Sequence, residues 1–389
     1  MIDYQSTLNR AVTEIRPSGI RRFFDIANEM DNVISLSIGE PDFSTPWHVR
    51  QEGIRSLEDG KTWYSPNRGF PELRTEICAF LKRHYRLTYD PKTDVIVTVG
   101  GSEAIDLTLR CLVNPGDEVL VPEPSFVCYK PLASMAGSVP VVIETKQEDR
   151  FRLTPEELEA KITPKTKILI LPYPNNPTGA VMRRSDMEQI ARVVEKHNLF
   201  VLSDEIYGEL TYGDTRHVSF AALDGMQERT VVVNGFSKAF AMTGWRLGYA
   251  AGPKEWIGQM TKLHQYGIMS APTVAQYAAV EAMRNGDGDI AYMREQYDMR
   301  RRLIVDGFNS MGLSCFEPEG AFYVFPCIKS TGLTSEEFCQ QLLQAERVAV
   351  IPGNAFGDCG EGFVRVSYSY SIRHITEALS RIGHFIKSR

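Results

Sequence analysis

The chain has 389 residues, of which 43% are hydrophobic and 24% are charged, and its formal net charge is −6. This composition is typical of a globular protein that buries a large core without disulfides or a structural metal. The acidic balance argues against a nucleic-acid partner, and no apolar run is long enough to span a membrane.

Cysteine and histidine are too dispersed to indicate a disulfide framework or a metal centre. The seven cysteines include no C-x-x-C pair, and the seven histidines show no metal-ligand spacing such as H-E-x-x-H. The first residues, MIDYQSTLNRAVTEIRPSGIRRF, contain neither an apolar segment nor a cleavage site. We therefore expect a cytoplasmic protein with no metal site and no membrane partner.

Short apolar runs alternate with helical patterns through the middle of the chain. Several runs are continuously apolar rather than alternating, which is typical of parallel strands that helices cover on both faces. The succession of strand, helix and strand predicts an open α/β sheet. The predicted strands are 95–100, 118–122, 140–144, 167–172, 199–204, 230–235 and 247–252.

Helix starts support this spacing. Thr154, Ser185 and Thr334 each stand three positions before a glutamate, a pattern that predicts a capping box. After about residue 285 the pattern changes to one long amphipathic helix, 289–312, followed by short strands and helices that suit a smaller α+β domain. No Gly- or Pro-rich linker separates the two regions, so we expect the long helix to connect them.

The segment NGFSKAFAMTGWRLGY, residues 234–249, carries the strongest chemical signal. It places Lys238 among small and apolar residues after an apolar strand, eight positions before Arg246. An amine that is desolvated or close to another cation becomes a good nucleophile toward carbonyl groups. A surface lysine at a strand end is the alternative for Lys238 taken alone, and the neighbouring Ser237 and T-G-W-R sequence argue against it.

The pattern S-K-x7-R together with G-W-R-L-G resembles the signature of class I and II aminotransferases, which have the type I fold and depend on pyridoxal 5′-phosphate (PLP). The other family motifs follow in order, and the resemblance runs from about Arg16 to the C-terminus. It implies a large domain with a mostly parallel central sheet wrapped by helices, plus a smaller α+β domain. We expect residues 1–48 to form an N-terminal arm and part of the small domain, 49–285 the large PLP-binding domain and 286–389 the small C-terminal domain.

The resemblance also implies the catalytic residues. Lys238 would bind PLP covalently as a Schiff base, and Asp204, at the end of LFVLSD, would keep the pyridinium nitrogen protonated so that the ring acts as an electron sink. Tyr207, and Asn176 in Y-P-N-N-P-T-G, would donate hydrogen bonds to the ring's phenolate oxygen. Taken alone, Asp204 would be interpreted as a helix cap and N-P-T-G as a plain turn.

A phosphate site is expected where V-T-V-G-G-S-E-A-I joins a strand to a helix, because backbone N–H groups and a helix N-terminus attract an anion there. Its residues would be Gly101, Ser102, Ser237 and Arg246. Phe126 in P-E-P-S-F-V-C-Y stands where the family stacks an aromatic ring on the cofactor, with a core phenylalanine as the alternative. The chain has no G-x-G-x-x-G and no P-loop, which weakens a nucleotide-binding interpretation.

Further residues are implied to face the substrate or a neighbouring subunit. Gly39 in S-I-G-E-P-D-F would lie against the substrate, and Ile20 in P-S-G-I-R-R-F would line its side chain. Arg365 in F-V-R-V-S-Y-S would bind the substrate α-carboxylate, with an internal ion pair as the alternative. Tyr64 would reach the phosphate of the neighbouring subunit in a homodimer with shared active sites, unless it is an ordinary loop aromatic.

These residues predict a transaminase that moves an amino group from an L-amino acid to a 2-oxo acid such as 2-oxoglutarate. The apolar Ile20 favours aromatic or broad specificity, whereas Arg21 or Arg22 would suit an acidic substrate. The chain is also similar to bacterial aspartate and N-acetyl-diaminopimelate aminotransferases, which stay open as alternatives. A PLP-dependent carbon–sulfur β-lyase would keep the same fold. A non-catalytic aminotransferase-like regulator is disfavoured, because the chain has no basic helix-turn-helix segment.

Overall fold

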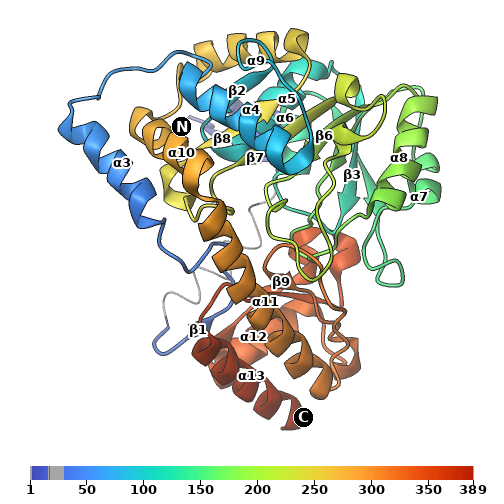
Figure 1. Cartoon of the computed structure of the whole chain (residues 1–389). Coiled ribbons are helices and arrows are strands. Elements are labelled where there is room, and N and C mark those ends of the chain that lie inside the picture. Colours follow the sequence, from blue (N-terminus) through green and yellow to red (C-terminus); the bar gives the residue numbers. More distant parts are fainter. Residues whose placement is uncertain (1, 16, 18–29, 389) are drawn as a thin grey trace.

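The computed structural model describes residues 2–15, 17 and 30–388. It contains a larger body built around a seven-stranded sheet and a smaller one built around a three-stranded sheet (Figure 1). Helix α11, Asp287–Ser310, runs from the larger body into the smaller one. A single long helix therefore takes the place of a linker, as the sequence predicted.

The large sheet has the strand order β2-β8-β7-β6-β5-β3-β4. Its strands run parallel except for β8, which is antiparallel to both β2 and β7. This mostly parallel sheet confirms the predicted α/β class. The strands are β2 (Val95–Thr98), β3 (Glu118–Glu123), β4 (Val139–Glu144), β5 (Thr166–Leu171), β6 (Phe200–Asp204), β7 (Thr230–Gly235) and β8 (Gly248–Ala251).

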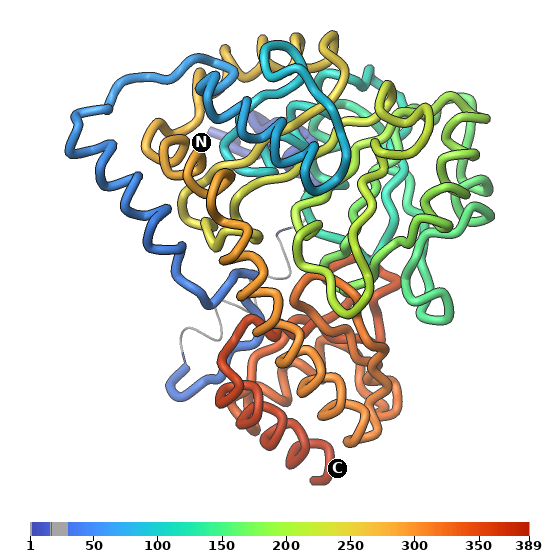
Figure 2. The backbone as a smooth tube through the Cα atoms, in the orientation of Figure 1, coloured from blue at the N-terminus to red at the C-terminus, as the bar shows by residue number. Residues whose placement is uncertain are grey.

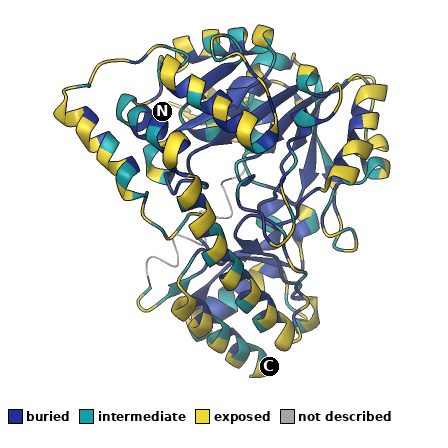
Figure 3. Ribbon diagram, in the orientation of Figure 1, coloured by how far each residue is buried: buried dark blue, intermediate teal, exposed yellow. Residues whose placement is uncertain are grey.

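Burial on both faces explains the continuous apolar runs. Along β3, Val119 and Val121 pack into a core on one face, whereas Leu120 between them packs into the core on the other. Side chains alternate between faces along a strand, so a strand covered on both sides needs apolar residues throughout. Figure 3 shows the sheet buried and the outer helix faces exposed. One face is covered by α5 (Gly100–Leu112), α6 (Tyr129–Met135) and α9 (Lys254–Gly267), the other by α4 (Pro71–Tyr85), α8 (Arg184–Lys196) and α10 (Thr273–Asn285).

The smaller body combines segments from both ends of the sequence. Its antiparallel sheet has the order β11-β12-β9, and a separate parallel pair joins β1, Ile34–Ser35, to β10, Val348–Ala349. In Figure 2 the blue segment around β1 lies beside the red C-terminal part of the chain. The run RVAVIPG, residues 347–353, which reads as one short strand in the sequence, is divided between β10 and β11. The other elements here are β9 (Tyr323–Val324), β11 (Ile351–Pro352), β12 (Val364–Ser367), α12 (Ser335–Glu346) and α13 (Ile372–Lys387).

Two of the three predicted capping boxes are confirmed. Thr154 and Thr334 cap α7 and α12, and each bonds the glutamate three residues later. The prediction for Ser185 is wrong, because the cap of α8 is Arg183, two residues earlier, and the backbone N–H of Arg183 bonds the carboxylate of Asp186 at 2.9 Å. The remaining helices are α1 (Arg10–Thr13), α3 (Trp47–Glu58) and α7 (Pro155–Glu159), with short 3-10 turns between elements. No helix in the described ranges is long and apolar enough to cross a bilayer.

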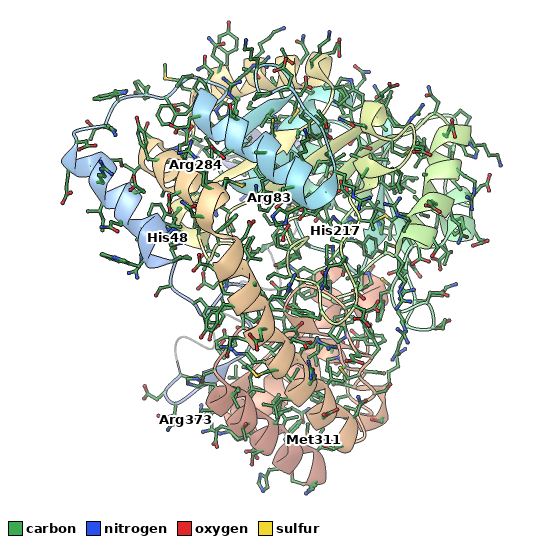
Figure 4. The ribbon with its side chains drawn as sticks, viewed as in Figure 1. His48, Arg83, His217, Arg284, Met311 and Arg373 are labelled. Carbon is green, nitrogen blue, oxygen red and sulfur yellow. The ribbon has the colours of Figure 1, made fainter. Side chains whose placement is uncertain are left out.

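Two histidines fasten the start of α11 to neighbouring helices. His48, at the α3 end that faces α11 (Figure 4), bonds Glu281 of α10 at 2.7 Å and Asp289 of α11 at 2.9 Å. His84 at the end of α4 lies 3.1 Å from Glu209 and 3.3 Å from Asp287. Burial alone would lower the pKa of both imidazoles, but the hydrogen bonds and charges of their carboxylate partners outweigh it and raise each pKa.

A raised histidine pKa predicts a pH-dependent contribution to stability. The contribution is complete below the unfolded pKa of about 6.5 and is lost as pH rises through the higher folded pKa. We expect His48→Gln to lower the free energy of unfolding most at about pH 6, with a smaller loss at about pH 9. Urea titrations of both proteins at the two pH values measure this difference. His374→Gln, which removes a histidine that bonds the Ser371 hydroxyl rather than a carboxylate, is the control. A loss that does not depend on pH would contradict the prediction.

Candidate active site

A cavity of about 590 Å³ lies between the two bodies and receives side chains from both. The segments that follow the strands of the large sheet supply most of its wall, and β9 and β12 of the smaller sheet supply Tyr323 and Arg365. The predicted site residues that line it are Gly39, Gly101, Ser102, Phe126, Asn176, Asp204, Tyr207, Ser237, Lys238, Arg246 and Arg365.

The direction of the strands explains why residues so far apart in sequence meet here. Ser102, Asn176, Asp204 and Lys238 follow or end the parallel strands β2, β5, β6 and β7. Arg246 precedes β8, which is antiparallel, so the start of β8 lies at the same edge as the ends of its neighbours. The carboxyl edge of a parallel sheet is where α/β proteins bind their ligands.

Lys238 projects into the cavity from the turn after β7. Its Nζ donates a hydrogen bond to the carbonyl oxygen of Gly39 at 2.5 Å and lies 5.7 Å from the ring centre of Tyr207. The pKa of this amine is lowered to about 8. Desolvation is the largest cause, the carboxylates of Glu40 and Asp204 oppose it, and the positive charges of Arg365 and Arg246 act in the same direction as desolvation. A substantial fraction of the amine is therefore neutral and nucleophilic near physiological pH.

Asp204 is a buried carboxylate with two hydrogen-bond donors. The hydroxyl of Tyr129 donates to its Oδ2 at 2.7 Å, and the backbone N–H of Ile206 donates to its Oδ1 at 3.2 Å. Desolvation raises the pKa of Asp204 to about 6, and the two hydrogen bonds oppose that rise. The side chain is thus ionised at neutral pH but remains ready to pair with a positive group.

An anion cradle lies at the N-terminus of α5. Gly100 has a φ of +77°, and a Cβ at this position would stand 2.7 Å from a guanidinium nitrogen of Arg246. Arg246 itself has a φ of 52°, and its guanidinium donates to the carbonyl of Thr243 at 2.9 Å. Free N–H groups in the first turn of a helix, next to a guanidinium, form a site for a phosphate group.

Arg365 is buried without a counter-ion. Its guanidinium donates to Asn176 Oδ1 at 3.0 Å and to the carbonyl of Ser37 at 2.5 Å. Its Nε has no partner, and no carboxylate of the described residues pairs with it. Burying a cation without a counter-ion costs free energy. The Arg365 guanidinium is therefore suited to bind an anionic ligand, and among the described residues it forms no internal ion pair.

These donors fit PLP in their chemistry. The site combines an amine of lowered pKa, a buried carboxylate, and a cradle that needs glycine beside an arginine. Each matches one part of the cofactor: its aldehyde, its pyridine nitrogen and its phosphate. Nowhere among the described residues do three or more His, Cys, Asp or Glu side chains lie together so that they could hold a metal ion.

Comparison with known proteins agrees with this chemistry. The sequence model of the family described as aminotransferase class I and II matches residues 31–382. The chain belongs to this family. A Bacillus subtilis protein, YugH, named as an aminotransferase without a stated substrate, is 51% identical over 98% of both chains. An aspartate aminotransferase of Pyrococcus abyssi is 46% identical over 96% of this chain and 97% of its own.

A solved structure of a related aminotransferase has the same fold as this chain. The aromatic aminotransferase from Pyrococcus horikoshii matches with a TM-score of 0.91 at 46% identity, over 94% of this chain and 99% of that one. The protein is therefore a PLP-dependent aminotransferase, which transfers an amino group from an amino acid to a 2-oxo acid.

One described residue of the predicted site, Tyr64, does not line the cavity of this aminotransferase. Tyr64 is 77% exposed. Ile20 falls outside the described residues, as do Arg21 and Arg22.

Several residues that line the cavity were not predicted from the sequence, and three of them make hydrogen bonds within the site. Tyr129 bonds Asp204, Tyr323 lies 2.8 Å from the hydroxyl of Tyr207, and Glu40 accepts a hydrogen bond from Thr243 at 3.1 Å. Tyr129 stands three residues after Phe126, and the two rings meet edge to face at 6.2 Å. The spacing of three residues from Phe126, at the start of a helix, is the one sequence feature that could have indicated Tyr129.

Proposed function

We propose that this aminotransferase prefers aromatic or other large amino acids as donors, with broad specificity, and uses a 2-oxo acid such as 2-oxoglutarate as acceptor. The charge of the cavity supports this. Among the described residues that line it, the cations are Lys238, Arg246 and Arg365. In our proposal these serve the cofactor aldehyde, its phosphate and the substrate α-carboxylate. None of them is left to pair with a second carboxylate, which is costly to bury alone.

An acidic substrate would need a cation from outside this set. Arg21 and Arg22, beyond the described residues, are the candidates in this chain, and either would equally serve the distal carboxylate of 2-oxoglutarate. The Pyrococcus abyssi relative is named an aspartate aminotransferase, so aspartate is the second candidate donor.

The reactions of single amino acids with the PLP-loaded protein test this preference. We expect phenylalanine to discharge the cofactor's visible absorbance roughly tenfold faster than aspartate or an N-acetylated diamino acid. Arg365→Lys should slow all three donors alike, because it disturbs the shared α-carboxylate contact. A faster reaction with aspartate that Arg21→Ala or Arg22→Ala removes would establish the acidic preference instead. Release of pyruvate from cystathionine without an acceptor would indicate a β-lyase.

The proposed roles follow from the positions of the side chains. Lys238 would hold the cofactor covalently, and its amine, when free, would take the proton from the substrate Cα. Asp204 keeps the proton on the pyridine nitrogen, and bound PLP supplies the electron sink for the charge left at Cα. Tyr207 and Asn176 donate to the ring's phenolate oxygen, and Arg365 grips the α-carboxylate with two parallel hydrogen bonds.

The remaining roles concern binding. Gly101, Ser102, Ser237 and Arg246 hold the phosphate, and Phe126 packs on the cofactor ring. Gly39 leaves room for the substrate, and Ile20 lines the substrate's side chain. We keep the division into residues 1–48, 49–285 and 286–389 as part of this proposal, with 49–285 as the cofactor-binding domain.

We also propose a homodimer in which Tyr64 reaches the phosphate of the neighbouring subunit. Large apolar side chains gather around Tyr64: Trp63 is 60% exposed, Ile268 51% and Met269 45%. The side-chain amide of Asn67 donates to the carbonyl of Met269 at 2.8 Å, which holds the loop that contains Tyr64 next to Ile268 and Met269. Exposed apolar patches of this kind mark protein interfaces.

Sedimentation equilibrium and cofactor affinity test the dimer together. We expect a dimer, and we expect Tyr64→Phe to bind PLP about tenfold more weakly without changing the assembly, since one hydrogen bond to a charged phosphate is lost. A monomer that binds PLP normally would contradict the shared site. We further propose a cytoplasmic location, because all seven cysteines are free, as is usual in a reducing compartment.

A further inference from the structure

Tyr323 lines the cavity, and the roles proposed above do not include it. It belongs to β9 of the smaller sheet and is 1% exposed, and its hydroxyl lies 2.8 Å from the hydroxyl of Tyr207 in the larger body. This contact joins the two bodies at Tyr207, which in our proposal donates a hydrogen bond to the cofactor's phenolate oxygen. The inference below rests on that proposed function.

The direction of this hydrogen bond follows from counting hydrogens. Each tyrosine hydroxyl has one hydrogen to donate and lone pairs to accept. If Tyr207 donates its hydrogen to the cofactor's phenolate oxygen, its own oxygen must accept from Tyr323. A hydroxyl that accepts a hydrogen bond becomes a stronger donor, because bonds in a chain polarise one another.

The ring of Tyr323 has a second contact, with Arg365. The guanidinium carbon lies 4.6 Å from the centre of the Tyr323 ring and 4.8 Å from that of Phe356. A planar guanidinium held between aromatic faces keeps its plane fixed. That plane decides whether its two N–H groups can meet the two oxygens of a carboxylate.

Gly39 also lies next to the hydroxyl of Tyr323. A Cβ at residue 39 would stand 2.3 Å from the Tyr323 oxygen, so a side chain there would displace the hydroxyl. The carbonyl of Gly39 accepts from the Lys238 amine. Tyr323 thus borders three residues of the proposed site: Tyr207, Arg365 and Gly39.

We propose that Tyr323 is a positioning residue with two separable functions: its hydroxyl donates to Tyr207 and strengthens that residue's bond to the cofactor, and its ring holds the Arg365 guanidinium in the plane that binds the substrate carboxylate. The first function acts on the protonation of the bound cofactor. The second acts on recognition of the substrate.

Two substitutions separate these functions. Tyr323→Phe removes the hydroxyl and keeps the ring, whereas Tyr323→Leu removes both. A weaker bond from Tyr207 leaves more negative charge on the phenolate oxygen, which then holds the nearby proton on the Lys238 nitrogen to a higher pH. We expect the absorbance change of the loaded Tyr323→Phe protein to move upward by about 0.5 to 1 pH unit, with KM for the amino acid changed less than about twofold.

Tyr323→Leu should add a roughly tenfold rise in KM, because the stacking contact with Arg365 is lost. Tyr368→Phe is the matched control. Tyr368 is also fully buried and donates to the carbonyl of Ala321 at 3.1 Å, but it does not line the cavity. We expect Tyr368→Phe to lose stability comparably to Tyr323→Phe in urea titrations and to titrate like the wild type.

A double-mutant cycle decides whether Tyr323 acts through Tyr207. In a Tyr207→Phe background, Tyr323→Phe should cause no further shift of the absorbance titration. An additive shift, or an unshifted titration of the single Tyr323→Phe protein, would overturn the inference while leaving the proposed function intact. A wild-type protein that takes up no PLP would overturn both.

Discussion

Replacing Lys238 with alanine is expected to lower the rate of amino transfer by ~10⁴-fold or more, because in our proposal this one side chain supplies both the covalent attachment and the proton transfer at Cα. The fold should remain, since the Lys238 side chain makes one hydrogen bond, to the carbonyl of Gly39. Discharge of the cofactor's absorbance by an amino acid measures the rate, and thermal unfolding of the cofactor-free protein measures the fold.

Two further variants make the Lys238 result specific. Lys238→Arg keeps a positive charge but has no neutral amine at working pH, so it should be as inactive as Lys238→Ala. Lys262→Ala removes an exposed lysine that bonds Gln259 on α9, and it should leave the rate unchanged. More than about one tenth of wild-type turnover in Lys238→Ala would show that another group carries the chemistry.

Asp204→Asn is expected to have the second-largest effect, a loss of roughly 10³-fold in the rate of amino transfer. An amide has almost the same shape, although its single oxygen can accept from only one of the two donors, the Tyr129 hydroxyl or the N–H of Ile206. It has no negative charge to hold a proton on the pyridine nitrogen, however, so the electron sink is weakened. Asp106→Asn, which removes a carboxylate paired with Arg110 on α5, is the control and should remain active.

The same substitution should stabilise the protein when no cofactor is bound. The folded pKa of Asp204 is raised to about 6 by desolvation, above the unfolded value of about 3.9. The unfolded state therefore loses this proton first, and the wild type loses stability as pH rises from about 4 to about 6. Asp204→Asn escapes that loss, so its advantage in urea titrations should be absent at about pH 3 and complete above about pH 7. An advantage of equal size at both pH values would contradict the assignment of a buried, ionising carboxylate.

The large sheet could be predicted from the sequence because its physical cause is local. Residues 119–122 and 168–172 are apolar throughout, and a strand buried on both faces requires that. The smaller sheet was predicted less well. Its strands are short, and the run 347–353 is divided between two strands that pair with different partners, β1 and β12. Pairing with β1, more than three hundred positions earlier, leaves no local pattern.

The site residues also divide into those with a local sequence signal and those without one. Asp204 and Lys238 could be placed together because each follows a predicted parallel strand, and such strands end at one edge. Tyr129 and Tyr323 could not, since their importance comes from hydroxyl contacts with residues 75 and 116 positions away. In a sequence, a buried tyrosine that bonds a functional residue is indistinguishable from one that fills a core.

The nitrogen of residue 238 is where the account can be tested most directly. Reduction of the cofactor-loaded protein with borohydride fixes any carbon–nitrogen double bond, and peptide mass mapping then locates the modified lysine. We predict a pyridoxyl group on the peptide that contains Lys238, and none after the same treatment of Lys238→Ala. A modified lysine elsewhere in the chain, or no modification at all, would contradict the assignment of this cavity as the active site.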